Sequence, residues 1–408
     1  MARSSKSPAP PPRGNLTYVR IIRNNYRNEQ KALCLRAAKS RHALRRREPD
    51  IPDRANIRLA YAHDADTILH CRAYERYAEK TDMFFPLGGS ASRRIIGLQY
   101  AVKIARTLAR CLSLNEDLVE AVSYAHGLGN APFGKVGSDF LSQHLRSIGV
   151  GVYSQPAQAV RALDALENDG RGLNLTLQTL DGVLAGRCDV QEPIIQPNPK
   201  NLNWNTLDAN ISSCLRVPEA EKGVYPASLE GCVVRATLIL ARFGSALEDG
   251  VAVGLIQRND LPKEVRTTLG EHYFDIINRV VMDVIDHSYE QDHIAFSEEI
   301  FAALRVLSGF IAERIVNTPA VQDESRRLAH VLGDLYGLFL DDLDSGDESR
   351  AIYALYVKTM PEQYRRETPA SRIVCDFMAG VTDDFLVEQY TRRFFPHTII
   401  SKFQKRGS

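Results

Sequence analysis

The sequence predicts an all-α fold for this chain of 408 residues. Apolar residues recur at helical spacing along seven segments, a pattern that buries one face of an α-helix. Short stretches that alternate apolar and polar residues, as half-buried strands do, are scarce. Turn signals at Gly88-Gly89, Asn168-Asp169-Gly170 and Pro197-Asn198-Pro199 divide the helical segments. The expected helices are, in order, Ile95–Leu112, Leu118–Leu128, Val160–Leu166, Leu229–Leu247, Phe274–Val284, Ile300–Ile315 and Leu328–Leu340.

The composition suits a globular protein, with 44% hydrophobic and 25% charged residues. No apolar run approaches the roughly 20 residues that a membrane-spanning helix needs, so we expect no membrane partner. The seven cysteines are scattered and form no CxxC pair, which indicates a reducing compartment and argues against a zinc site. The start lacks an apolar leader, so we expect a cytoplasmic protein. Because the first 28 residues contain no acidic residue, an organelle presequence, and hence an organelle matrix, remains the alternative.

Charge divides the chain into an arm at residues 1–48 and a main domain at 49–408. The arm contains 13 Lys and Arg against two acidic residues, so it carries +11; since the whole chain carries +1, the rest carries −10. A basic arm on an acidic body predicts an anionic partner such as nucleic acid. The alternatives are a solvated tail or an arm lying on an acidic neighbouring subunit. Residues 1–14 are rich in Pro, Ser and Lys, and we expect them to be disordered alone.

A polar insertion near residues 189–227 contains several prolines and the only tryptophan, Trp204. Loops of this length without predicted secondary structure are often functional. The insertion could equally be an oligomer contact or a passive surface.

Four stretches carry a recognisable set of motifs. Residues 64–81 read DADTILHCRAYERYAEKT, similar to D-R-D-R-I-I-H-S-x-A-F-R-R-L-x-x-K-T. Residues 94–106 read RIIGLQYAVKIAR, similar to R-L-T-H-S-L-E-V-A-Q-I-A-R. Residues 115–138 read NEDLVEAVSYAHGLGNAPFGKVGS, similar to N-E-D-L-V-E-A-x-x-x-A-H-D-L-G-H-P-P-F-G-H-x-G-E, and residues 376–383 read DFMAGVTD, similar to D-Y-I-A-G-M-T-D. In order and spacing the chain resembles the bacterial deoxyguanosine triphosphate triphosphohydrolase (dGTPase)-like HD-domain family.

Weaker matches at 172–176 and 228–230 extend the resemblance over roughly Asp64 to Pro396. The resemblance implies the HD-domain helical fold of the dNTP triphosphohydrolases, a hydrolase dependent on Mg or Mn, and assembly into oligomers. Some members of the family bind single-stranded DNA, which would suit the basic arm.

The metal-binding positions of the family are degenerate in this chain. An HD site holds its divalent ion with two imidazoles and two carboxylates, and the ion polarises phosphate and water. The matching positions here are Gly97, His126, Gly127 and Leu238. Because one imidazole cannot hold a labile divalent ion, we expect no metal, no catalytic residue and a pseudoenzyme that acts by binding. An active dNTP triphosphohydrolase with a rebuilt site is the alternative, and a nucleic-acid-binding protein using the arm is a second one.

The replacements predict a basic pocket. The family's other reactive histidines and glutamate become Asn130, Lys135, Ser138 and Gln155, whereas packing and turn residues such as Gly129 are kept. Arginines at 235 and 242 share a helix face with Leu238, because their spacing is i, i+3 and i+7. Lys and Arg can hold phosphates without a metal, so we expect a nucleotide or polyphosphate ligand. The candidate ligands to phosphate are Lys135, Arg235, Arg242, Arg76 and Lys80.

Blander interpretations accompany these candidates. Arg235 and Arg242 could simply pair with nearby acids such as Glu248 or Asp249. The dipeptide His63-Asp64 aligns with a different motif from the metal pair. The pairs Asp286-His287 and Asp292-His293 fit a solvated helix end better than a surface metal site. As a binding protein, the chain would assemble with its own copies or with an active paralogue.

Overall fold

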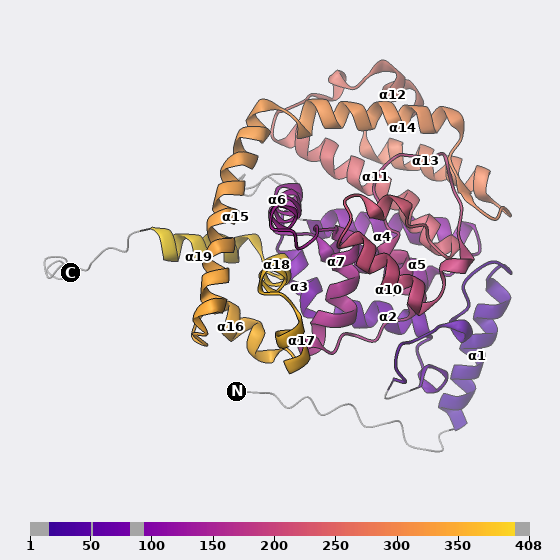
Figure 1. Ribbon diagram of the computed structural model, residues 1–408. Coiled ribbons are helices and arrows are strands. Elements are labelled where there is room, and N and C mark those ends of the chain that lie inside the picture. Colours follow the sequence, from indigo (N-terminus) through magenta and orange to yellow (C-terminus); the bar gives the residue numbers. More distant parts are fainter. Residues whose placement is uncertain (1–15, 50–51, 82–93, 396–408) are drawn as a thin grey trace, which may run out of the picture.

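A computed structural model describes residues 16–49, 52–81 and 94–395 of the chain. The described residues form helices and one two-stranded antiparallel sheet, so the all-α prediction is confirmed (Figure 1). The segment at residues 1–14 that we expected to be disordered alone, and the turn predicted at Gly88-Gly89, lie outside the described residues. No helix in the described part of the chain is both long and apolar enough to span a membrane.

The centre of the molecule is a layer of helices whose apolar faces meet. Helix α4 (Arg94–Cys111) packs against α5 (Glu116–His126) and α11 (Leu229–Ala252), and α5 also packs on α2 (Ala60–Leu69) and α9 (Leu177–Leu184). The predicted helices at 95–112, 118–128 and 229–247 match α4, α5 and α11 to within a few residues. Side-chain caps begin two of them: Asn115 accepts from two backbone amides of α5, and Ser228 accepts from one of α11.

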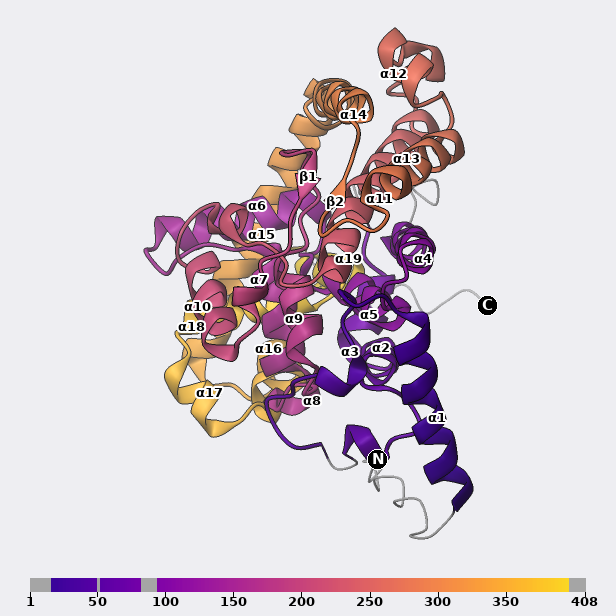
Figure 2. The ribbon, with the colours of Figure 1, turned by 90° about the vertical axis from the view of Figure 1, so that its right-hand side faces the viewer.

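Shorter helices surround this layer (Figures 1 and 2). The predicted helix at 160–166 is displaced: α7 covers Gln155–Arg161, and a π-helical turn follows at Ala162–Leu166. The earlier start has a local reason, because Pro156 stands in the first turn, where its missing amide costs no hydrogen bond. The remaining short helices of this region are α1 (Leu16–Ala32), α3 (Arg72–Ala78), α6 (Gly134–Ser147), α8 (Glu167–Gly170) and α10 (Trp204–Cys214).

A second apolar cluster lies beside the first and joins buried residues at 131–153 to those at 332–386, whereas the buried apolar residues at 276–315 belong to the first cluster. Helix α15 (Pro319–Ser345) packs on α6 and on α18 (Ala370–Gly380), and this contact buries Phe339 against Phe377. Predicted helices at 274–284, 300–315 and 328–340 correspond to α13 (Tyr273–Ser288), to α14 (Glu298–Ile311) with the π-helical turn at Ala312–Val316 after it, and to α15. The other helices are α12 (Lys263–Thr268), α16 (Ala351–Leu355), α17 (Glu362–Glu367) and α19 (Asp383–Phe394).

The polar insertion is ordered and contains helix α10, which the sequence did not predict. Strand β1 (Ile194–Ile195) pairs antiparallel with β2 (Ile294–Ala295), and Trp204 lies under the guanidinium of Arg46 at 4.3 Å. The insertion therefore contacts the basic arm, through Trp204 and Arg46, and pairs with β2 through β1.

The second half of the basic arm forms ion pairs with the main domain of its own chain. Arg45 is paired with Asp53 and Asp64 at 2.8 Å each, and Arg46 with Asp164 at 3.0 Å and Asp208 at 2.7 Å. These two positive charges are neutralised within the chain.

Candidate functional site

The four positions that match the family's metal ligands come from the central helices. Gly97 is in α4, His126 ends α5, Gly127 begins the turn of 3-10 helix after it, and Leu238 is in α11. We call these four residues the HD positions. Because α11, α4 and α5 pack on one another, the HD positions lie on adjoining elements.

Tyr77 occupies the space beside Gly127. A Cβ atom on Gly127 would lie 2.5 Å from Tyr77 Cζ and 2.6 Å from the tyrosine hydroxyl oxygen, distances that real Cβ atoms do not show. The ring is buried, at 6% exposure, so it cannot simply swing into solvent. A carboxylate side chain at position 127 does not fit beside Tyr77 as it stands.

The other two replaced positions are likewise apolar or crowded. Leu238 is buried within the main hydrophobic core. A Cβ on Gly97 would lie 2.7 Å from Ser245 Oγ, a side chain that can rotate away. Neither position supplies a donor atom for a cation.

His126 remains, in an apolar setting. Its Nδ1 atom is buried without a hydrogen-bond partner in the described structure, and its Nε2 atom lies 3.6 Å from Cys188 Sγ. Burial lowers the pKa of His126 to about 4, so the ring is neutral at physiological pH. Across residues 16–49, 52–81 and 94–395, no group of three His, Cys, Asp or Glu side chains is arranged to hold a metal ion. The residues at the HD positions do not fit the family's divalent ion.

The proposed phosphate ligands are dispersed over different surroundings. Lys135 is exposed on α6 and pairs with Asp139 at 2.6 Å. Arg235 is 1% exposed, pairs with Glu192 at 3.2 Å and lies over the Tyr225 ring. Arg242 is exposed.

Arg235 does pair with an acidic residue, as the alternative interpretation expected, but not with Glu248 or Asp249. Its partner Glu192 comes from the insertion, whereas Glu248 pairs with Arg258 at 2.8 Å. The single basic pocket expected around Lys135, Arg235 and Arg242 is not assembled by these contacts.

The His-Asp dipeptides have structural partners. Asp64 is fully buried and accepts hydrogen bonds from the Thr176 amide and hydroxyl and from Thr179 Oγ1. His287 Nδ1 lies 3.4 Å from Asp283 Oδ1, and His293 Nδ1 lies 3.1 Å from Asp292 Oδ1, both in partly exposed pairs.

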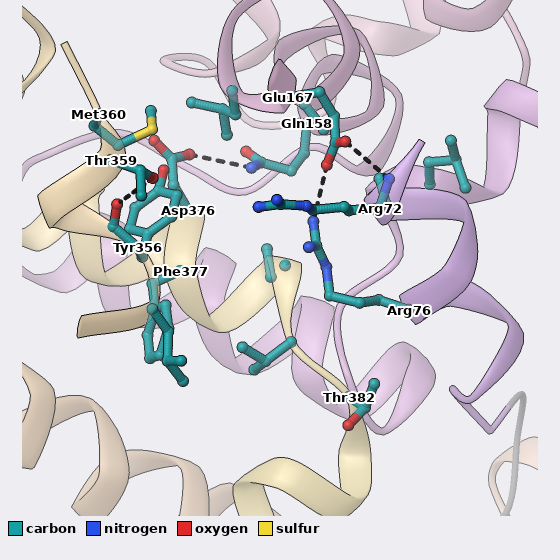
Figure 3. Close-up of a pocket in the computed structure, with 18 of the residues that line it drawn as sticks. Arg72, Arg76, Gln158, Glu167, Tyr356, Thr359, Met360, Asp376, Phe377 and Thr382 are labelled. Carbon is teal, nitrogen blue, oxygen red and sulfur yellow. Dashed lines mark hydrogen bonds and ion pairs between the residues drawn. The ribbon is translucent and has the colours of Figure 1, made fainter. Parts of the chain in front are cut away.

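Two of the candidates, Arg76 and Lys80, do line a pocket of about 340 Å³ (Figure 3). The pocket lies where the two apolar clusters meet, with α3, α7 and the turn after it on one side and the chain from α16 to α19 on the other. Arg72 and Arg76 both extend from α3 into it, opposite Asp376 and Tyr356 (Figure 3). Its size is within the range of about 300 to 1,000 Å³ found for small-molecule sites.

The basic side chains of this pocket differ in how many hydrogen bonds and ion pairs they already make within the chain. Arg76 Nη2 donates to Glu167 Oε1 at 2.9 Å, and its Nε atom is buried without a partner. Lys80 Nζ donates to the Asn130 and Ala379 carbonyl oxygens, both at 2.7 Å. Burial, assisted by the charge of Arg94, lowers the pKa of Lys80 to about 7. The Arg72 guanidinium makes no hydrogen bond or ion pair with the described residues, so its charge is available.

The opposite wall is built on the buried carboxylate of Asp376. This group accepts from Arg161 at 2.8 and 3.0 Å, from Tyr364 Oη at 2.8 Å and from Gln158 Nε2 at 3.1 Å. The sequence alone gives Gln158 and Arg161 no site role, and it shows Asp376 only as the first residue of the motif at 376–383. Their grouping depends on contacts between residues more than 200 positions apart, which no local pattern reveals.

Comparisons with known proteins agree with this architecture. Residues 294–392, which supply Tyr356 and Asp376, match the phosphohydrolase-associated domain. A protein of Caldanaerobacter subterraneus subsp. tengcongensis, named deoxyguanosinetriphosphate triphosphohydrolase-like protein, is 31% identical over 90% of this chain and 94% of its own length. Proteins of the same name from Desulfatibacillum aliphaticivorans and Caulobacter vibrioides are 28% and 29% identical, over 87% and 84% of this chain and 92% of each relative. The chain belongs to the deoxyguanosinetriphosphate triphosphohydrolase-like family of HD-domain proteins.

Proposed function

We propose that this chain is a member of its family that does not hydrolyse dNTPs at the HD positions and acts by binding instead. The observation that carries the proposal is the Tyr77 ring packed against Gly127, since it fills the place of one carboxylate ligand. Leu238, in the hydrophobic core, supports the same conclusion for a second carboxylate. A lone neutral imidazole at His126 offers too few donors for a divalent ion.

A non-hydrolytic subunit would act through what it binds. The candidates are a nucleotide or another phosphate-bearing ligand, held by arginines, and partner subunits, either its own copies or an active paralogue. The chain could bind both a ligand and partner subunits, since a ligand-bound subunit can alter the assembly that contains it.

The test measures hydrolysis and metal together. Purified full-length chain is incubated with each of the four dNTPs in the presence of Mn²⁺ or Mg²⁺, and release of tripolyphosphate is followed. Bound metal is measured by mass spectrometry on the dialysed protein. His126→Ala, purified in the same way, is the control for contaminating hydrolases. We expect no turnover that depends on His126 and no stoichiometric metal. Turnover that His126→Ala abolishes would show an active enzyme with a rebuilt site, and one metal ion per chain would show that a metal site is retained; either result would overturn the proposal.

A further inference from the structure

We infer that the pocket between α3 and α18 is a binding site for a nucleoside phosphate, separate from the HD positions. The inference deepens the proposed function by naming a ligand class and a site for it. It rests on three features of the pocket: an available positive charge, a buried acceptor without a donor, and an aromatic wall.

The positive charge is supplied by the two arginines on α3. Both side chains reach into the pocket (Figure 3), and an anion held there would meet several N–H donors. Glu167 already takes one donor of Arg76, and its other oxygen accepts from the Arg72 backbone amide at 3.0 Å. That arrangement holds Arg76 in place and leaves its buried Nε atom and the whole Arg72 guanidinium for a ligand.

The two buried acidic groups of the pocket, Asp376 and Glu167, do not cancel this charge. Asp376 is paired with Arg161 at 2.8 Å and is further neutralised by hydrogen bonds from Tyr364 and Gln158. Glu167 is occupied by Arg76. Two of the three carboxylates that line the pocket are therefore neutralised, and the third, Asp169, is exposed to solvent, which screens its charge.

The unsatisfied acceptor is the Oε1 atom of Gln158. Gln158 is 2% exposed, and Oε1 has no hydrogen-bond partner in the described structure. The amide cannot be turned to remove the problem, because Nε2 donates to Asp376 Oδ1 at 3.1 Å and an oxygen there would face the carboxylate. A buried acceptor without a donor is unfavourable, so the site favours a ligand with an N–H or O–H group at this point. Inorganic phosphate near neutral pH has an O–H group only on the anion itself, whereas a nucleotide carries further N–H and O–H groups on its base and sugar, away from the phosphate.

The aromatic wall lies beside these groups. The Tyr356 and Phe377 rings have centroids 5.8 Å apart, and the Tyr356 hydroxyl is bonded to Tyr364 at 2.8 Å. Rings held in this way provide a surface for a nucleobase. A cavity of about 340 Å³ is at the small end of ligand pockets, which favours a mononucleotide over a nucleoside triphosphate.

The test is calorimetric titration of the full-length chain with dGMP, dAMP, dCMP and TMP, and separately with inorganic phosphate. We expect at least one mononucleotide to bind tenfold or more tightly than phosphate. Arg72→Ala should weaken that nucleotide by tenfold or more without a change in melting temperature, because this side chain has no partner among the described residues. The matched control is Arg146→Ala, which removes an exposed arginine from α6 outside the pocket and should leave the affinity unchanged.

A second variant, Gln158→Leu, separates a nucleoside from a simple anion. It should abolish the preference for the nucleotide over phosphate and change the affinity for phosphate by less than twofold. Failure of all four mononucleotides to bind, or wild-type affinity in Arg72→Ala, would overturn the assignment. These results are independent of hydrolysis: turnover lost in His126→Ala would overturn only the proposed function, and wild-type binding by Arg72→Ala would overturn only this site.

Discussion

The buried ring of Tyr77 lies where a side chain on Gly127 would have to be, with 2.5 Å between Tyr77 Cζ and the position of a Cβ. The two residues belong to different motifs, 50 positions apart, and each explains the other. A glycine leaves room for the tyrosine, and the tyrosine excludes the aspartate of a His-Asp pair.

Restoring that aspartate should therefore damage the protein and not activate it. Gly127→Asp should lower the free energy of unfolding by about 1 to 3 kcal/mol, the usual cost of overpacking a core. In the double variant Tyr77→Ala/Gly127→Asp the cost should be smaller than the sum of the two single costs, by about 1 kcal/mol, because the clash is gone. Urea unfolding of the four proteins measures this coupling. Additive costs would mean that the ring and the glycine are independent.

The Asp376 cluster should be a major contributor to stability. Asp376→Ala leaves the mostly buried Arg161 guanidinium without its partner and should cost about 3 to 5 kcal/mol. Asp139→Ala is the control, since it breaks the exposed pair with Lys135 and should cost less than about 1 kcal/mol. Chemical denaturation of both variants compares the two losses directly, and equal losses would contradict a special role for the cluster.

Lys80 should make stability rise with pH. Burial, with a smaller effect of Arg94, lowers its pKa from 10.5 to about 7 in the folded chain. Between pH 7 and 10.5 the unfolded chain binds more protons at this residue, so its contribution to folding becomes more favourable as pH increases, by about 1 kcal/mol per pH unit. Lys80→Met lacks this rise. The free energy of unfolding of the variant should therefore fall relative to that of the wild type between pH 7 and 9. Urea titrations at pH 7, 8 and 9 check this, and a difference that stays constant with pH would rule it out.

Arg45 should act as a structural residue, although the sequence places it in a basic arm. Its guanidinium is 2.8 Å from the fully buried Asp64 carboxylate, so Arg45→Met leaves that charge without its cationic partner and should cost about 3 kcal/mol. Arg41→Met, which removes an exposed arginine of the same segment, should cost less than about 1 kcal/mol. Thermal unfolding distinguishes the two, and a small cost at Arg45 would mean that residues 33–48 are loosely attached.

Part of this protein follows from its sequence alone. Helical periodicity over 95–112 and 229–247 identifies α4 and α11, because an amphipathic helix carries its apolar pattern in local order. The motif residues identify the family, and their resemblance to its motifs predicts that Gly97, Gly127 and Leu238 stand at its metal positions. These are properties of neighbouring residues along the chain, so they need no knowledge of the fold.

Only the tertiary structure decided what those positions have become. Arg235 and Arg242 share a face by helical spacing, yet one is covered by Glu192 and Tyr225 of the insertion and the other is exposed. Spacing fixes the direction of a side chain about its own helix axis, but not which distant segment covers it. For the same reason Arg72 and Gln158 meet in one pocket, and Tyr77 reaches Gly127, only because helices far apart in the sequence pack together.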